Sequence, residues 1–254
     1  MSGTGTSQGP AGTHPAWRVY GIVPAETALP DWAAVGPAVR KPELLRHGQI
    51  AAVVEPLDSD QRLGRRDLLA HAEVLNAIAE HGPVVPVAFG SAFAERDQVI
   101  TELLAPQETA LASMLDQLRG QAQFLLRLRY AQETLLAMII AGDPEIAELR
   151  EQTRQQPEDS PDNIRLGELV VRAVEARQAE DSDRVLATLG PVAADSKVSG
   201  RTLTNGTVTL AFLVPDRQRA EFEAAAEEIA AQLADRAAVE LQGPLAPFDF
   251  VPSL

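Results

Sequence analysis

Four histidines are the residues of this 254-residue chain best suited to hold a metal ion or move a proton. His14, His47, His71 and His81 fall on unrelated segments, and the ten residues from His71 to His81 match no ligand spacing on a helix. The chain has no cysteine, which excludes thiolate ligands, disulfides and a cysteine nucleophile. The sequence therefore predicts no metal site, and His71 is expected to be a partly exposed or hydrogen-bonded structural residue.

A nucleophilic serine and a carboxylate pair are the other chemistries that the sequence could offer. Ser91 follows Gly90 after an apolar run, but a Gly-x-Ser-x-Gly elbow and a nearby base are absent, which favours a capped strand-to-helix turn. Glu227 and Glu228 are adjacent, so they would point to different sides of a helix and are expected to be solvated. No glycine-rich phosphate loop occurs. The sequence predicts no catalytic residue and no cofactor, and we expect a protein that is not an enzyme.

Charge and composition narrow the expected partners. The formal net charge is −14, and lysines and arginines form no cluster, which argues against binding to nucleic acid or to anionic membranes. The most apolar run, Leu135–Ala141, is far shorter than the roughly 20 apolar residues of a membrane-spanning helix. The absence of cysteine suits a reducing compartment, so the expected location is the cytoplasm.

The N-terminal half of the chain reads as a small α+β domain over residues 16–118, after a Gly-, Ser- and Thr-rich tail at 1–15 that we expect to be disordered and that lacks the features of a signal peptide. Strands are predicted at 17–23, at 49–55 and at 84–89, the last covered on both faces, with a proline-rich loop between the first two that has room for a strand around 38–46. Helices are predicted over 65–81, with Leu68, Ala72, Leu75 and Ala79 as the buried stripe, over 95–104, and from Pro106 to Gly120.

The C-terminal half is predicted to be a ferredoxin-like domain over residues 119–254. A half-buried strand at 124–130 precedes helices through Arg150, a helix around 166–173, and a short helix capped by Ser182. Asn205-Gly206 predicts a hairpin between 197–204 and 207–214, and a helix from Asp216 and a strand at 238–242 follow. This β-α-β-β-α-β order is that of a ferredoxin-like sandwich, so the predicted fold is α+β with two domains, the first a related α/β sandwich.

Two segments taken together resemble the gas vesicle GvpF/GvpL family. One is the helix containing His71 followed by His81-Gly82-Pro83-Val84-Val85-Pro86-Val87-Ala88-Phe89-Gly90-Ser91-Ala92-Phe93. The other comprises Ala211-Phe212-Leu213-Val214, the helix after it and Gly243-Pro244-Leu245-Ala246-Pro247-Phe248-Asp249-Phe250. With the opening strand 19–23 and the element order, the resemblance spans residues 16–254. Ala88, Ser91, Leu245 and Phe248 stand where the family usually has Arg, Thr, Trp and Tyr. Roles that need a guanidinium, an indole or a phenol are therefore not carried over, while roles that rest on Gly, Pro and a planar ring are.

The resemblance implies an accessory protein of gas vesicles that acts in vesicle assembly, associates with the hydrophobic shell protein and with other accessory proteins, and is found in the cytoplasm and at the vesicle. A minor structural component of the shell and a small-ligand-binding or enzymatic ferredoxin-like protein are the alternatives. Rings beside Gly or Pro either plug the core or form an apolar binding surface, and core packing is favoured for any single ring. The candidate partner-binding residues lie at two alternative places, the 89–93 turn and the 247–250 end: Phe89, Gly90, Phe93, Pro247, Phe248 and Phe250.

Overall fold

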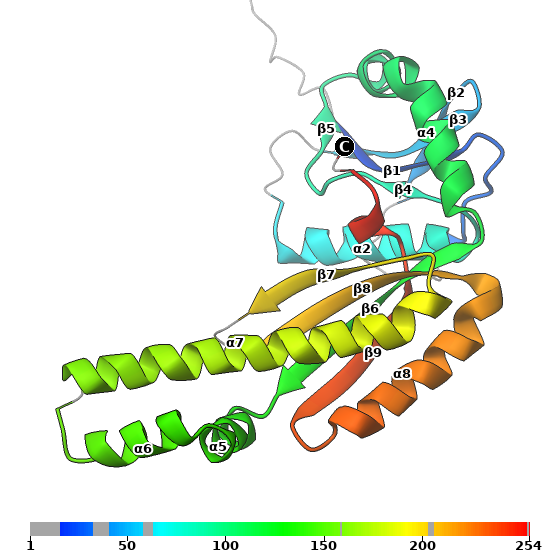
Figure 1. Ribbon diagram of the computed structural model, residues 1–254. Coiled ribbons are helices and arrows are strands. Elements are labelled where there is room, and N and C mark those ends of the chain that lie inside the picture. Colours follow the sequence, from blue (N-terminus) through cyan, green and yellow to red (C-terminus); the bar gives the residue numbers. More distant parts are fainter. Residues whose placement is uncertain (1–15, 33–40, 58–62, 158, 203–205, 253) are drawn as a thin grey trace, which may run out of the picture. The chain divides into compact units, whose positions relative to one another are not determined.

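The computed structural model describes residues 16–32, 41–57, 63–157, 159–202, 206–252 and 254 (Figure 1). Contacts divide the chain into two compact units, one from the N-terminus through Gly120 together with Leu245–Leu254, the other Gln121–Pro244. Each unit contains its own sheet, which confirms the predicted α+β class. The last ten residues belong to the first unit, whereas the sequence placed them in a domain running from 119 to 254. That each unit is an independently folding domain remains a prediction.

The first unit is built on a sheet with the order β2-β3-β1-β4, in which β5 also pairs with β1. The strands are β1 (Ala16–Pro24), β2 (Glu43–His47), β3 (Ile50–Leu57), β4 (Val85–Pro86) and β5 (Ala92–Phe93). The helical segments are α2 (Arg65–Ala79), α3 (Arg96–Gln98), the π-helical turn η1 (Val99–Leu104) and α4 (Ala105–Leu118). β1 and β3 are buried at nearly every position, as expected of strands covered by helices such as α2 and α4.

Two predictions for this unit need correction. The strand expected at 84–89 pairs in the sheet only at Val85 and Pro86, and burial ends at Val87, since Ala88 is exposed and Phe89 is half-buried. Pro86 has no N–H to continue a ladder. The two helices expected on either side of Ala105 form one continuous helical stretch, with π-helical geometry just before Pro106. Of the strand expected around 38–46, residues 38–40 lie outside the described residues, residues 41–42 are not in a strand, and residues 43–46 belong to β2.

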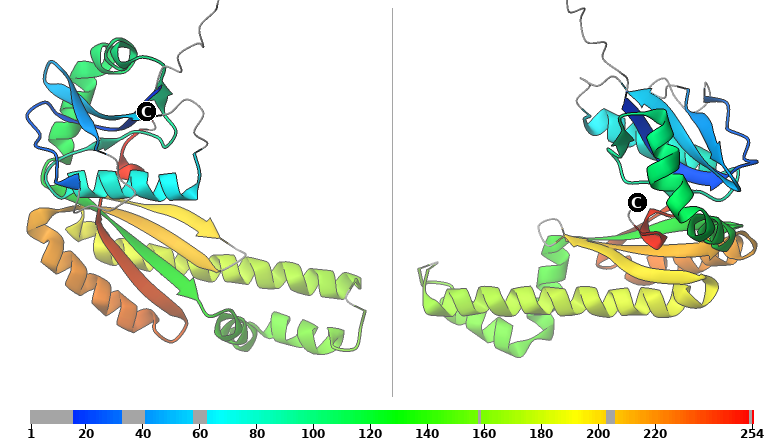
Figure 2. Two further views of the ribbon diagram at one scale, coloured as in Figure 1. Left: turned by 180° about the vertical axis from the view of Figure 1, so that it is seen from behind. Right: turned by 90° about the horizontal axis from the view of Figure 1, so that it is seen from above.

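The second unit has the strand order β7-β8-β6-β9, and its elements follow the predicted β-α-β-β-α-β sequence (Figure 2). The strands are β6 (Gln121–Tyr130), β7 (Asp195–Thr202), β8 (Thr207–Pro215) and β9 (Ala237–Leu245). The helices are α5 (Gln132–Gly142), α6 (Pro144–Thr153), α7 (Pro161–Leu189) and α8 (Arg219–Leu233), with short 3₁₀ turns η2 (Gly190–Val192) and η3 (Asp216–Gln218). This topology is consistent with the ferredoxin-like arrangement.

The local sequence patterns of the second unit predicted its strands, its hairpin and the buried face of α8. Alternate residues of β6 are buried, and Phe124 lies opposite Phe212 of the antiparallel strand β8. The predicted hairpin is present, with Thr202 paired to Thr207, while the turn residues 203–205 lie outside the described residues. The predicted stripe of α8, including Phe222, is buried in the same core. The sheet and α8 therefore share one apolar interior.

The long helix α7 corrects another prediction. Ser182 was expected to cap a separate helix, but α7 runs unbroken from Pro161 to Leu189. Ser182 is buried, and its hydroxyl donates to the Gln178 carbonyl oxygen four residues earlier, at 2.5 Å. A serine can satisfy its hydroxyl in this way without ending a helix. The N-cap is instead Ser160, whose Oγ accepts from the Asn163 N–H at 3.3 Å.

Gly243 lies inside β9, which extends to Leu245 and not only to Gln242 as predicted. A Cβ atom at Gly243 would stand 2.4 Å from Cδ1 of Phe124, a ring that is 1% exposed. Phe124 also packs against Phe222, with 5.4 Å between ring centroids. The ring therefore has little room to move, and glycine is required by close packing.

Gly243→Ala is expected to lower the free energy of unfolding by about 1–3 kcal/mol, because overpacking a filled core forces side chains off their rotamers. The matched control is Gly167→Ala in α7, where an added Cβ meets nothing within 4 Å. That control should raise stability by about 0.5–1 kcal/mol through better helix propensity. Urea unfolding of both variants measures the difference, and a Gly243→Ala protein as stable as wild type would contradict the packing argument.

Candidate functional site

The C-terminal segment Leu245–Leu254 is fixed to the first unit at both ends. Near its start, the Ala246 N–H donates to Asn76 Oδ1 of α2 at 2.9 Å, and Ala246 is fully buried. At its end, the Leu254 carbonyl oxygen accepts from the Ala88 N–H at 3.2 Å. Between these points Phe248–Phe250 forms a 3₁₀ turn, η4. The segment is therefore held against α2 and the residues that follow β4.

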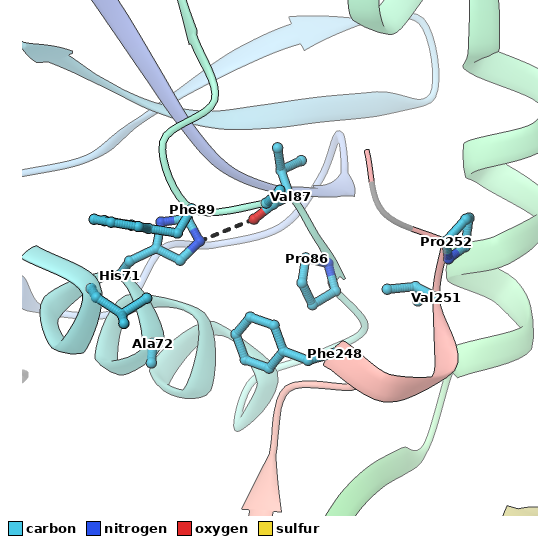
Figure 3. A pocket seen from close by; sticks show the side chains of 10 residues that line it. His71, Ala72, Pro86, Val87, Phe89, Phe248, Val251 and Pro252 are labelled. Atoms are coloured by element: carbon cyan, nitrogen blue, oxygen red, sulfur yellow. Dashed lines mark hydrogen bonds between the residues drawn. The ribbon is translucent and has the colours of Figure 1, made fainter. Parts of the chain in front are cut away.

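This docking creates an apolar groove of about 220 Å³, here called the Phe89–Phe248 groove. Figure 3 shows the Phe248 ring between Ala72 and Pro86, with His71 and Phe89 above Ala72. Phe248 and Leu68 are 40% and 47% exposed, so two large apolar side chains of the groove reach solvent. The groove is lined by Leu68, His71, Ala72, Pro86, Val87, Ala88, Phe89, Phe248, Val251 and Pro252.

The six candidate residues named from the sequence separate in the structure. Phe89 and Phe248, one from each of the two alternative places, line the same groove. Phe93 and Phe250 are half-buried and do not line the groove, and Phe93 pairs with Trp17 in the sheet. Pro247 is buried, and Gly90 is exposed in a turn with φ of 96°. The two alternatives thus meet in one surface, and partner binding there remains a proposal.

The helix face of α2 differs from the predicted stripe, and this difference produces one wall of the groove. The residues of α2 that are buried are Ala70, His71, Val74, Leu75 and Ile78. Leu68 was expected inside, but the buried face is turned toward His71, which leaves Leu68 at the groove rim. The sequence signal that could have revealed this is the His71-Val74-Leu75-Ile78 spacing, which is as regular as the predicted one.

His71 is 1% exposed and forms part of the groove wall. Its Nε2 lies 3.0 Å from the Val87 carbonyl oxygen, and a carbonyl only accepts, so Nε2 carries the proton. The ring stacks on Tyr20 at 5.1 Å and meets the edge of Phe89 at 5.6 Å. Burial lowers the pKa of His71 below its usual value. The hydrogen bond to Val87 opposes this shift, and the positive charge of Arg18 lowers the pKa further. The imidazole is therefore neutral at neutral pH.

The polar residues behind this wall form hydrogen bonds with one another. The Tyr20 hydroxyl donates to Glu55, and Arg18 Nη1 lies 3.4 Å from that hydroxyl. Burial, together with the Glu55 contact, raises the pKa of Tyr20, which keeps the phenol protonated. Across the described residues, no three His, Cys, Asp or Glu side chains gather closely enough to hold a metal ion. The groove thus offers an apolar surface bordered by one neutral ring.

Comparison with known proteins gives the chain its family. The sequence matches the family model "Gas vesicle synthesis protein GvpL/GvpF" over residues 16–252. The chain belongs to the GvpL/GvpF family. It is 30% identical over 239 residues to gas vesicle protein F of Streptomyces sp. strain CB03234, an alignment that covers 92% of this chain and 98% of that protein. These matches confirm the resemblance found in the two sequence segments.

Solved structures of GvpF proteins have the same fold. The crystal structure of GvpF from Anabaena sp. PCC7120 matches with a TM-score of 0.77 at 19% identity, covering 94% of this chain and 99% of that one. The crystal structure of GvpF from Microcystis aeruginosa matches with a TM-score of 0.73 at 22% identity, covering 92% and 98%. Within the part of the GvpL/GvpF chain that the structure describes, no helix has both the length and the apolar composition of a membrane span.

The lowered pKa of His71 predicts a loss of stability in acid. The unfolded chain has the ordinary histidine pKa near 6.5, so as the pH falls below that value the unfolded state takes up a proton that the native state does not. Stability should be complete above this range and decline as the pH falls toward the lower native pKa. Urea unfolding at pH 7.5 and 5.0 tests this, and His71→Phe should show a smaller decline between the two. An equal decline in both proteins would contradict the assignment.

Loss of the Asn76 side chain should release the C-terminal segment. In Asn76→Ala the buried Ala246 N–H has no acceptor, which is expected to cost about 1–3 kcal/mol. The segment should also become sensitive to limited proteolysis and to hydrogen exchange at Ala246. The matched control is Asn163→Ala, which removes an exposed hydrogen bond from the Asn163 side-chain amide to the Pro157 carbonyl oxygen. This change should alter the free energy of unfolding by less than about 0.5 kcal/mol. Unchanged exchange at Ala246 would rule out the anchoring role.

Proposed function

We propose that this GvpL/GvpF protein is a non-enzymatic accessory protein that acts in the cytoplasm during gas vesicle assembly, by binding the apolar shell protein and other accessory proteins. We further propose that the Phe89–Phe248 groove is its shell-protein-binding surface. The observation that carries the proposal is the meeting of Phe89 and Phe248, from distant parts of the sequence, in one open apolar groove. Among the described residues that line the groove there is no carboxylate or lysine that would favour a charged ligand.

Exposure of the groove residues supports a role in binding. Leu68 and Phe248 are large apolar side chains that contact water in the isolated chain, and Leu69, which follows Leu68 in the sequence, is 55% exposed. Exposed apolar surface of this kind marks interaction sites in otherwise soluble proteins. The formal net charge of −14 favours solubility despite that surface. An apolar subunit awaiting assembly needs such a partner to cover its own surface.

The dimensions of the groove support recognition of a short apolar segment. A volume of about 220 Å³ has room for one large side chain, flanked by contacts with the rim. Side chains that fill such pockets commonly dominate the binding energy of an interface. We therefore expect the shell protein to insert one apolar anchor between Phe89 and Phe248.

Phe248→Ser is the direct test, because the side chain is exposed and can be changed with little effect on folding. Its affinity for purified shell protein, measured by pull-down and by titration, should fall about tenfold or more, while the free energy of unfolding stays within about 0.5 kcal/mol. Val198→Ser on β7 is the matched control, since Val198 is 36% exposed and lies outside the groove. Equal binding by wild type and Phe248→Ser would sink the proposal for this surface.

The alternative to a role in assembly is that the protein is a permanent component of the vesicle shell. Vesicles washed with urea and probed for this chain distinguish the two, since an assembly factor should be removed from the vesicle and a shell component retained. Deletion of the gene should reduce vesicle number or alter vesicle shape. Normal vesicles in the deletion strain would overturn the proposed role in assembly.

A further inference from the structure

In the second unit, α5 and the first half of α7 carry apolar side chains that the core does not cover. The fully buried residues of α7 begin at Gln178, while Ile164 and Val171 are 57% and 51% exposed. α5 is the sequence Gln-Glu-Thr-Leu-Leu-Ala-Met-Ile-Ile-Ala-Gly, of which Leu135 and Ile139 are the buried residues. Figures 1 and 2 show this half of α7 extending past the sheet beside α5 and α6.

A second groove, here called the α5–α7 groove, lies between these helices and has a volume of about 290 Å³. Two of its apolar side chains, Leu136 and Val171, are 38% and 51% exposed. Its place between two helices suits an amphipathic helical ligand, which can lay its apolar face into a groove. The groove is lined by Tyr130, Gln132, Leu135, Leu136, Val170, Val171, Val174, Gln178 and Gly206.

Gln178 supplies a hydrogen-bond donor that the described part of the chain leaves unused. The residue is 2% exposed, and its Nε2 has no partner among the described residues. The neighbouring Tyr130 hydroxyl is already committed, since it donates to Asp181 Oδ2 at 3.2 Å. Asp181 also accepts two hydrogen bonds from the Arg236 guanidinium, at 2.7 and 3.1 Å. A ligand that brings an acceptor to Gln178 would satisfy a buried amide within a mostly apolar groove.

The charge around the groove selects the kind of ligand. Residues 132–189 contain thirteen Asp and Glu residues and six arginines, a net charge of −7, which is half of the net charge of the chain. A second copy of this acidic chain, or an acidic partner, would be repelled. A ligand with lysines and arginines at its edges would be attracted.

We propose that the α5–α7 groove binds an amphipathic helix of another protein, whose apolar face is bordered by Lys and Arg and includes one hydrogen-bond acceptor that reaches Gln178. This site is separate from the Phe89–Phe248 groove, and it stands whether or not that groove binds the shell protein. The apolar face fills the space between Leu136 and Val171, and the basic borders pair with the acidic residues of the surrounding helices.

The test uses the full chain and a synthetic helical peptide of about 18 residues, with a leucine stripe at i, i+3, i+4 and i+7, lysine and arginine borders, and one glutamine in the stripe. Fluorescence anisotropy should show saturable binding that weakens as salt is raised. The same stripe with glutamate borders should bind at least about tenfold more weakly.

Two pairs of variants localise the binding. Val171→Arg should weaken it about tenfold or more, while Ile164→Arg, which adds the same charge at an equally exposed apolar position outside the groove, should change it by no more than about twofold. Gln178→Leu should weaken binding of the glutamine peptide about fivefold, and should not weaken binding of a peptide with leucine in that position.

Several results would overturn the proposal. These are the absence of saturable binding, equal binding of the acidic-bordered peptide, or equal effects of Val171→Arg and Ile164→Arg. Sedimentation equilibrium tests whether the groove binds a second copy of this chain. A dimer that dissociates in the Val171→Arg variant would assign the groove to self-association and not to a basic helix.

Discussion

The hydrogen bond from the Ala246 N–H to Asn76 Oδ1 determines where the end of the chain goes, and the groove of the first unit depends on it. The bond joins residues 170 positions apart, and Ala246 is fully buried beside α2. Once this point is fixed and Ala88 holds Leu254, the intervening turn must lie over α2. Phe248 is thereby brought to the wall opposite Phe89. Without this segment, α2 and the residues after β4 would form an exposed surface and not a groove.

The regular elements could be predicted because their signals are local. Alternation in β6, the hairpin residues and the stripe of α8 each follow from burial on one face of a strand or helix. One prediction failed because a side-chain hydroxyl had two ways to form a hydrogen bond. Ser182 could cap a new helix or bond to Gln178 within an existing one, and the sequence around it permits both. The apolar run 84–89 likewise indicated burial but could not show how few of its residues pair in the sheet.

The candidate site could be predicted only in parts. Phe89 and Phe248 were identified as rings beside Gly or Pro, yet they were assigned to different domains, because no local signal shows that the last ten residues return to the first unit. Leu68 was missed as a rim residue for a related reason. A histidine is rarely chosen as a core position, but the Val87 carbonyl and two flanking rings make His71 an acceptable one. That choice sets which face of α2 is exposed.

The two grooves differ in the unpaired polar atom of their lining, and we propose that this difference separates the ligands that they select. The neutral His71 ring donates through Nε2 to Val87, so its remaining nitrogen, which has no partner among the described residues, can only accept. Gln178 Nε2 can only donate. A ligand optimised for one groove would therefore leave a buried polar atom unpaired in the other, which costs more than the lost contact itself. In this proposal, apolar surface supplies the affinity of both grooves, and the unpaired polar atom supplies the discrimination of each.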